Sequence, residues 1–178
     1  MQIFHPNQDS APYYRLIALV VLIAVFITVA MQSIWKIRVA AERTHVAWMV
    51  GAMRSTIGIE VARRAVQGGL DQIAMLDQSN PMLLLDNQKS PMMGAFAYLG
   101  ELNHPDPTNI APGSWYFDSQ SRELVYRVTM DDAFVSTLKG PARIRFVLKG
   151  RYSNSGEKKM LNGIALVTLD EYRWTRPE

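Results

Sequence analysis

The chain has 178 residues, the usual size of one domain, and carries 19 Lys and Arg against 16 Asp and Glu. The formal net charge of +3 is too small and too dispersed to indicate a nucleic-acid-binding surface. Because cysteine is absent, disulfides, thiol catalysis and thiolate metal sites are excluded. The three histidines, His5, His45 and His104, are far apart in the sequence, so we expect no metal site.

Residues 16–31 form an apolar run, LIALVVLIAVFITVAM, with Tyr13 before it and Trp35 after it. Aromatic side chains favour the two interfaces of a bilayer, and these flanks bring the run to the roughly 20 residues that a spanning helix needs. We therefore predict one transmembrane helix at residues 13–35. The alternative is a cleaved signal peptide, with residues 28–30 as the small-residue cleavage site.

The charges around this helix bear on its orientation. Lys36, Arg38 and Arg43 follow the span and only Arg15 precedes it, a balance that favours a cytoplasmic C-terminal side. That tendency weakens where a long folded domain follows the span. We therefore expect residues 1–12 to be a short cytoplasmic tail and the C-terminal domain to lie outside the membrane.

Beyond the span, no proline or turn cluster interrupts the chain before Gly68 and Gly69. One helix is therefore predicted from about Tyr13 to Gln67, with residues 36–67 as its extramembrane continuation. Its apolar side chains recur at helical spacing and form a broad stripe that another surface must cover. The stripe consists of Ile34, Ile37, Ala41, Trp48 and Ala52 together with Val39, Val46, Met49, Met53, Ile57 and Val61.

Small side chains recur on the same segment in steps of three or four residues. They are Ala40, Thr44, Ala47, Gly51, Ser55, Gly58 and Ala62, here called the small-residue row. Such a row lets a second helix backbone approach closely. It is therefore a candidate helix–helix interface, with a homodimer as one assembly that it would allow. The alternative is that the row accommodates the sheet of the chain's own domain.

Charged residues of the extramembrane helix have the spacing of surface ion pairs. Glu60 stands three and four residues before Arg63 and Arg64, and Arg38 stands four residues before Glu42. Pairs of this kind contribute only tenths of a kcal/mol. We expect these charges to lie on a solvated face.

Residues 68–178 are predicted to form one α+β domain. A short amphipathic helix is expected directly after the glycine pair. Further on, Asn80 followed by Pro81 has the chemistry of a helix N-cap and a first helical position, which predicts a second short helix at residues 82–86. Four prolines with several Asn and Gly residues predict a surface loop at residues 87–113.

From residue 114 onward the apolar residues alternate, which is typical of strands. We predict a hairpin of residues 115–117 and 123–128, a strand at residues 143–152 and a last strand at residues 163–174. These strands make an antiparallel meander whose apolar face needs cover from the outer half of the long helix. The predicted fold class is α+β, a long N-terminal helix packed on a small antiparallel sheet.

The usual catalytic signatures are not recognisable. Residues 155–159, SGEKK, lack the first glycine and the Ser or Thr of a phosphate-binding loop, and neither GxGxxG nor GxSxG is present. The adjacent carboxylates at 131–132 and 170–171 are expected to point apart and to be exposed. The basic side chains of the strand at 143–152 are expected to keep it soluble rather than to bind an anionic partner. We predict a non-enzymatic protein without catalytic residues, cofactor or metal.

Recognition of a partner by the domain would favour aromatic side chains, which are enriched in interfaces. We select Tyr98, Trp115, Tyr116 and Tyr126 as the candidate partner surface, beside the Pro-rich loop at 87–113. Aromatic residues at strand spacing are also typical of a core, which is the alternative.

A long N-terminal helix, half in the membrane and half on a small sheet, resembles the architecture of type IV pilins and type II secretion pseudopilins. Four segments are also similar to the MshF family of biogenesis proteins of the mannose-sensitive haemagglutinin (MSHA) type IV pilus. They are residues 80–82 (NPM), 98–101 (YLGE), 112–118 (PGSWYFD) and 122–128 (RELVYRV). The resemblance implies a single-pass protein of the bacterial inner membrane with a periplasmic domain, whose partners are pilus-assembly proteins or pilins.

Two features of a prepilin are not recognisable here, a short basic leader that ends in glycine and a glutamate at the fifth position of the mature helix. We therefore expect an accessory role rather than polymerisation as an ordinary pilin. One alternative is a minor pilin or pseudopilin that enters a filament tip. A second alternative is a membrane-anchored extracytoplasmic sensor or enzyme with a ligand pocket.

Overall fold

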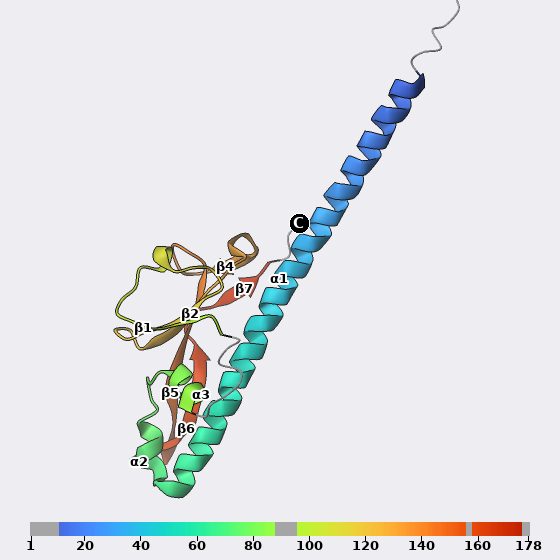
Figure 1. Cartoon of the computed structure of the whole chain (residues 1–178). Coiled ribbons are helices and arrows are strands. Elements are labelled where there is room, and N and C mark those ends of the chain that lie inside the picture. Colours follow the sequence, from blue (N-terminus) through green and yellow to red (C-terminus); the bar gives the residue numbers. More distant parts are fainter. Residues whose placement is uncertain (1–10, 88–95, 156–157, 176–178) are drawn as a thin grey trace, which may run out of the picture.

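The computed structural model describes residues 11–87, 96–155 and 158–175. Most of the predicted tail, up to residue 10, and residues 88–95 of the predicted loop lie outside the described residues. One helix, α1 (Ala11–Gln67), is the largest element, and its N-terminal half projects well beyond the domain (Figure 1). At 1.5 Å per residue a helix of this size is about 85 Å long. The prediction of one uninterrupted helix up to Gln67 is confirmed.

The N-terminal part of α1 is long and apolar enough to cross a membrane. Its most apolar window has a mean hydropathy of 2.6, and none of that window is buried by the described rest of the chain. A helix buried in the core of a soluble domain is excluded by this exposure, because the apolar side chains have no cover within the domain. A membrane anchor and a signal sequence both agree with the observation.

Two short helices follow the long one. Gly69 has a φ of +73°, a left-handed conformation that turns the chain back towards α1 at the start of α2 (Gly69–Ala74). Helix α3 (Pro81–Asn87) begins as predicted, since the side-chain oxygen of Asn80 accepts a hydrogen bond from the Met82 amide at 2.9 Å.

The domain contains a five-stranded sheet and a separate two-stranded sheet. The large sheet has the order β1-β2-β3-β5-β6, and β4 pairs with β7. The strands are β1 (Tyr98–Leu102), β2 (Trp115–Asp118), β3 (Glu123–Arg127), β4 (Phe134–Ser136), β5 (Arg143–Ser155), β6 (Lys158–Thr168) and β7 (Tyr172–Trp174). Short 3-10 helices lie at Pro107–Asn109 and Asp131–Ala133.

The predicted hairpin is confirmed, with Trp115 opposite Tyr126 in an antiparallel β2–β3 pair. The prediction that the sheet begins near residue 114 is wrong, because β1 lies in the segment expected to be a loop. Strand β1 also runs parallel to β2, so the sheet is mixed rather than antiparallel. The predicted last strand divides into β6 and β7, and β7 joins β4 in the second sheet.

The core lies between α1 and the inner face of the sheet. Trp115 at its centre is fully buried. The centroid of its ring lies 4.8 Å from the ring centroid of Tyr126 and 5.8 Å from that of Phe146. Full burial of one large apolar side chain contributes about 1.5–3 kcal/mol to the free energy of unfolding. Several such side chains of α1 and the sheet are buried against each other, and together they hold α1 on this face. A smaller cluster of Ile110, Tyr116 and Val125 covers the outer face of the sheet beneath the β1–β2 connection.

Candidate interaction surface on the long helix

The predicted apolar stripe of the extramembrane part of α1 divides into two opposite faces. Val39, Val46, Met49, Met53 and Ile57 are buried in the domain. Ile34, Ile37, Ala41 and Trp48 are exposed, and Trp48 keeps 52% of its surface accessible. The domain therefore covers only half of the stripe, and the other half has no cover from the described chain.

The small-residue row lies on the exposed side. All seven residues, Ala40, Thr44, Ala47, Gly51, Ser55, Gly58 and Ala62, are exposed. A Cβ added to Gly51 or to Gly58 would meet no atom within 4 Å. The alternative that the row accommodates the chain's own sheet is therefore wrong for Gly51, Ser55, Gly58 and Ala62. Ala40, Thr44 and Ala47 border hollows that β7 also lines. Contact with a second helix stays a prediction.

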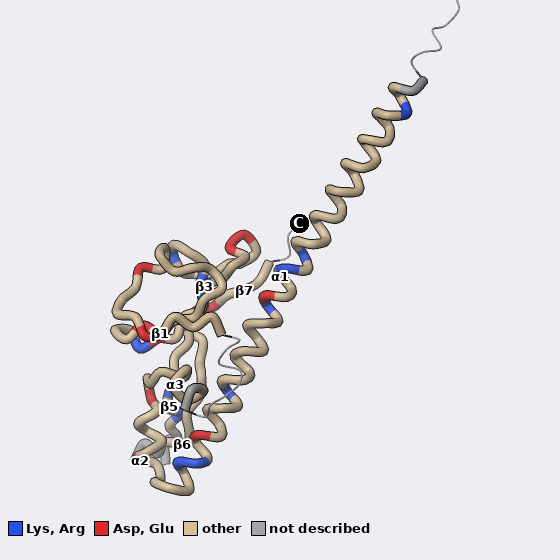
Figure 2. The backbone as a smooth tube through the Cα atoms, viewed as in Figure 1, with Lys and Arg blue, Asp and Glu red and all other residues tan. Residues whose placement is uncertain are grey.

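One exposed face of α1 has no charged side chain over a long distance. With 3.6 residues per turn, residues 33–66 place one set of exposed side chains on a single face. The set, here called the uncharged face, is Ser33, Ile37, Ala40, Ala41, Thr44, Ala47, Trp48, Gly51, Ser55, Gly58, Ile59, Ala62 and Val66. The face is about 50 Å long at 1.5 Å per residue. The charged residues of this segment lie at other angles around the helix, and Figure 2 marks their positions along the backbone.

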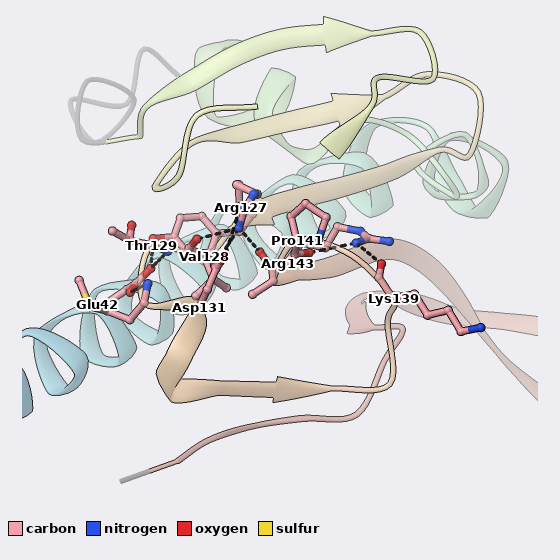
Figure 3. Close-up of polar contacts among 11 residues, drawn as sticks. Glu42, Arg127, Val128, Thr129, Asp131, Lys139, Pro141 and Arg143 are labelled. Atoms are coloured by element: carbon pink, nitrogen blue, oxygen red, sulfur yellow. Dashed lines mark hydrogen bonds and ion pairs between the residues drawn. The ribbon is translucent and has the colours of Figure 1, made fainter. Parts of the chain in front are cut away.

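Polar contacts on another side of α1 hold it against the domain. The carboxylate of Glu42 accepts hydrogen bonds from the Tyr126 hydroxyl at 2.9 Å, the Thr129 amide at 2.6 Å and the Met130 amide at 2.9 Å (Figure 3). Burial, and then the negative charge of Glu42, raise the pKa of Tyr126, so its hydroxyl stays a donor. The expected pairing of Glu42 with Arg38 is replaced by these contacts, which the spacing of charges within one helix cannot indicate.

The loop that meets Glu42 is itself held by a buried arginine. Arg127 donates to the carboxylate of Asp131 at 2.9 Å and to the carbonyls of Val128 at 3.0 Å and Ala142 at 2.8 Å (Figure 3). Charge-assisted bonds of this kind are roughly twice as strong as neutral ones. The site that receives Glu42 is thus pre-formed by the domain.

A second polar contact fixes the far end of α1. Glu60 accepts hydrogen bonds from Arg63 at 2.6 Å and from Arg64 at 2.7 Å, as its spacing predicts. The expected solvated face is wrong for Glu60, which is only 6% exposed. The hydrogen bond from Arg63 is the main cause that lowers its pKa to about 2. Arg64 also donates to the carbonyl of Gln72 at 2.9 Å and so ties α2 to α1.

The predicted aromatic partner surface is wrong for three of its four residues. Trp115 and Tyr126 are part of the core under α1, and Tyr116 is buried on the outer face of the sheet. Both faces of β2 and β3 are covered, so their rings cannot contact a partner. Tyr98 is half-buried, and its hydroxyl accepts a hydrogen bond from Asn80 at 2.8 Å.

Two of the basic side chains of β5 contact the domain itself. Arg145 pairs with Asp170 at 2.7 Å and with Glu123 at 3.3 Å, while Arg143 donates to two loop carbonyls. The expectation that Asp170 is exposed is wrong, since its side chain keeps only 12% of its surface accessible in this pair.

Sequence reasoning found the small residues of α1 but missed the uncharged face as a whole. The signal was available, because plotting the charged residues of 33–66 around a helical wheel shows the gap between them. No protein-family model, curated protein or solved structure matches this chain. The geometry defines a class, a long apolar N-terminal helix packed on a mixed sheet in a pilin-like architecture.

Proposed function

We propose that this chain is a non-enzymatic, membrane-anchored accessory protein of type IV pilus biogenesis, similar to the MshF family of the MSHA system. In this proposal residues 13–35 anchor the chain once in the bacterial inner membrane. The domain lies in the periplasm, and the uncharged face of α1 binds the long helix of another pilus-assembly protein or pilin. The uncharged face is the observation that carries the proposal.

Several properties of the face support a helix as its partner. Small side chains allow two helix axes to approach to about 8–10 Å, and exposed apolar side chains beside them supply burial. The largest of these are Ile37, Trp48 and Ile59, which are 67%, 52% and 58% exposed. Each would contribute about 1.5–3 kcal/mol on full burial.

The face also continues into the apolar run. Because α1 is one uninterrupted helix, the exposed side chains of its extramembrane half are in line with those of the predicted span. A partner that is itself a long helix with an apolar N-terminal half can pack along both parts. A globular partner matches only the extramembrane part of this surface. The continuity therefore favours a protein of the same architecture.

The test is site-specific photo-crosslinking in cells, with a photoreactive residue at Gly51 or Ser55 on the uncharged face. A matched control carries it at Asn109, which is exposed in the β1–β2 connection. Captured chains are identified by mass spectrometry, and the N-terminus of the protein is sequenced in the same sample. We expect capture of a pilin-like protein from Gly51 and Ser55, none from Asn109, and an uncut N-terminus.

Other outcomes separate the alternatives. A cut N-terminus and recovery in sheared filaments would assign the chain to the minor pilins. Capture only of a second copy would restrict the interface to a homodimer. Equal capture from Asn109, or no capture from the helix, would refute binding through the uncharged face and favour a sensor or an enzyme.

A further inference from the structure

Two adjoining hollows lie between α1 and strand β7. The first is lined by Lys36, Val39, Ala40, Arg43, Thr44, Trp174 and Thr175. The second is lined by residues of α1 and β7 with Phe146 and Thr168, and it includes Arg54, Tyr172 and Arg173. Both contain Arg43 and Trp174, so they form one continuous surface, here called the basic groove.

The described lining of the basic groove carries positive charge only. Lys36, Arg43, Arg54 and Arg173 line it, and no carboxylate does so among the described residues. Arg43 and Arg54 line the same hollow as Tyr172, and their charges act against the rise in the pKa of Tyr172 that burial causes. Several cations facing one concave surface attract an anion.

The nearest acid on α1 does not neutralise the groove. Glu42 directly precedes Arg43, but its carboxylate is occupied by the Tyr126 hydroxyl and by two loop amides. Adjacent residues of a helix point about 100° apart, so Glu42 and Arg43 serve different sides of α1. The domain keeps the acid on one side and leaves the bases in the groove.

The groove begins at the level of a membrane surface. The predicted span ends at Trp35, and Lys36 to Arg43 cover about 10 Å along the helix axis. The headgroup layer of one leaflet is about 5–7 Å thick. Lys36 therefore lies within this layer and Ala40 lies at its outer edge. Arg43 lies about 12 Å beyond Trp35, outside the layer, but the side chains of a helix point toward its N-terminus, so the Arg43 guanidinium is directed back toward the phosphates. Trp174 faces the same hollow, and tryptophan favours the interfacial layer.

We propose that the basic groove binds the phosphate headgroup of an anionic phospholipid of the phosphatidylglycerol class, taken from the leaflet next to the domain. The proposal rests on the membrane anchoring in the proposed function, but not on any pilus partner. Guanidinium groups bind phosphate oxygens in bidentate fashion, and Arg43 lines the same hollow as Lys36 and Trp174.

The test uses the full chain in nanodiscs of phosphatidylcholine with increasing fractions of phosphatidylglycerol. Because the chain has no cysteine, Thr175→Cys introduces a single thiol at the groove for an environment-sensitive fluorophore. The backbone amide of Thr175 donates to Ala133, a contact that the substitution leaves intact. Whether the chain is anchored in the membrane is measured separately, by its co-elution with the nanodisc. A control, Arg38→Gln, removes a charge two residues from Lys36 on α1 but outside the groove.

We expect the fluorescence to change and saturate with phosphatidylglycerol. A basic residue that is only near an anionic surface contributes about a fivefold change in affinity, so Arg38→Gln should weaken the response no more than about fivefold. Arg43→Gln also removes the direct hydrogen bonds to the phosphate and should weaken the response by more than about tenfold, and Arg43→Gln with Lys36→Gln by more than about 50-fold.

Four outcomes would overturn the proposal. An anchored chain without phosphatidylglycerol dependence would refute the groove alone, and an equal loss in Arg38→Gln would show unspecific attraction to the surface. The same response to inorganic phosphate in pure phosphatidylcholine nanodiscs would assign the groove to a free anion instead of a lipid. A chain that does not co-elute would refute the anchoring and the lipid site together.

Discussion

Glu42→Ala should detach the membrane-proximal part of α1 from the domain. The substitution removes the acceptor for the Tyr126 hydroxyl and for the Thr129 and Met130 amides. Tyr126 is only 3% exposed, so its hydroxyl loses its partner without access to water, a cost of about 1–3 kcal/mol. The Thr129 amide is in an exposed residue and can bond to water instead. We expect a net loss of about 2 kcal/mol in the free energy of unfolding.

The assay is urea denaturation of the full chain in detergent, with tryptophan fluorescence as the signal of unfolding. A double-mutant cycle with Tyr126→Phe isolates the hydroxyl–carboxylate contact and should give a coupling of about 1 kcal/mol. Arg38→Ala, an exposed change on the same helix, should cost less than about 0.5 kcal/mol. If Glu42→Ala costs no more than Arg38→Ala, the carboxylate does not hold the helix and the reasoning fails.

Three further predictions concern the helix and its supports. Gly51→Leu with Gly58→Leu should raise the free energy of unfolding by about 1 kcal/mol, because both sites are open and leucine favours a helix. The same change should abolish crosslinking from Ser55, because the larger side chains keep a second helix away. Retained capture would contradict a close helix contact. The pKa of Glu60 is lowered from 4.5 to about 2. The contribution of its carboxylate to the free energy of unfolding is therefore complete above pH 4.5 and is lost as the pH falls through about 2. Glu60→Gln should reduce the fall of the urea denaturation midpoint in acid, and an unchanged fall would refute this. Asn80→Ala should cost about 1–2 kcal/mol in urea denaturation through loss of the α3 cap, and a cost near zero would show that the cap is dispensable.

The main elements could be predicted from the sequence where one physical pattern dominates. The long helix follows from the absence of breakers before Gly68, and the β2–β3 hairpin follows from alternation around a polar turn. Ile144, Phe146 and Leu148 are buried on one face of β5, as their alternation predicts. These are local signals, and tertiary contacts reinforce them.

The errors arise where tertiary contacts decide. Strand β1 contains Gly100 at a φ of +94° and lies beside a Pro-rich segment, so its local chemistry is that of a loop, and only pairing with β2 makes it a strand. Trp115 was expected to contact a partner because a single sequence does not show that both faces of β2 are covered. Glu42 was assigned to its neighbours on the helix, whereas its partners lie more than 80 residues away.

The charges that follow the predicted span also take a different meaning in the folded chain. The tendency of basic residues to remain in the cytoplasm is established for short loops next to a span. Here Lys36 and Arg43 lie on a rigid helix that continues into the domain, and both line the basic groove beside Trp174. In the proposed orientation, lipid phosphates would neutralise them on the outer side of the membrane. Under these proposals one side of α1 is buried in the domain, the basic groove faces headgroups, and the uncharged face, which shares Ala40, Thr44 and Ala47 with the groove, is left for another helix.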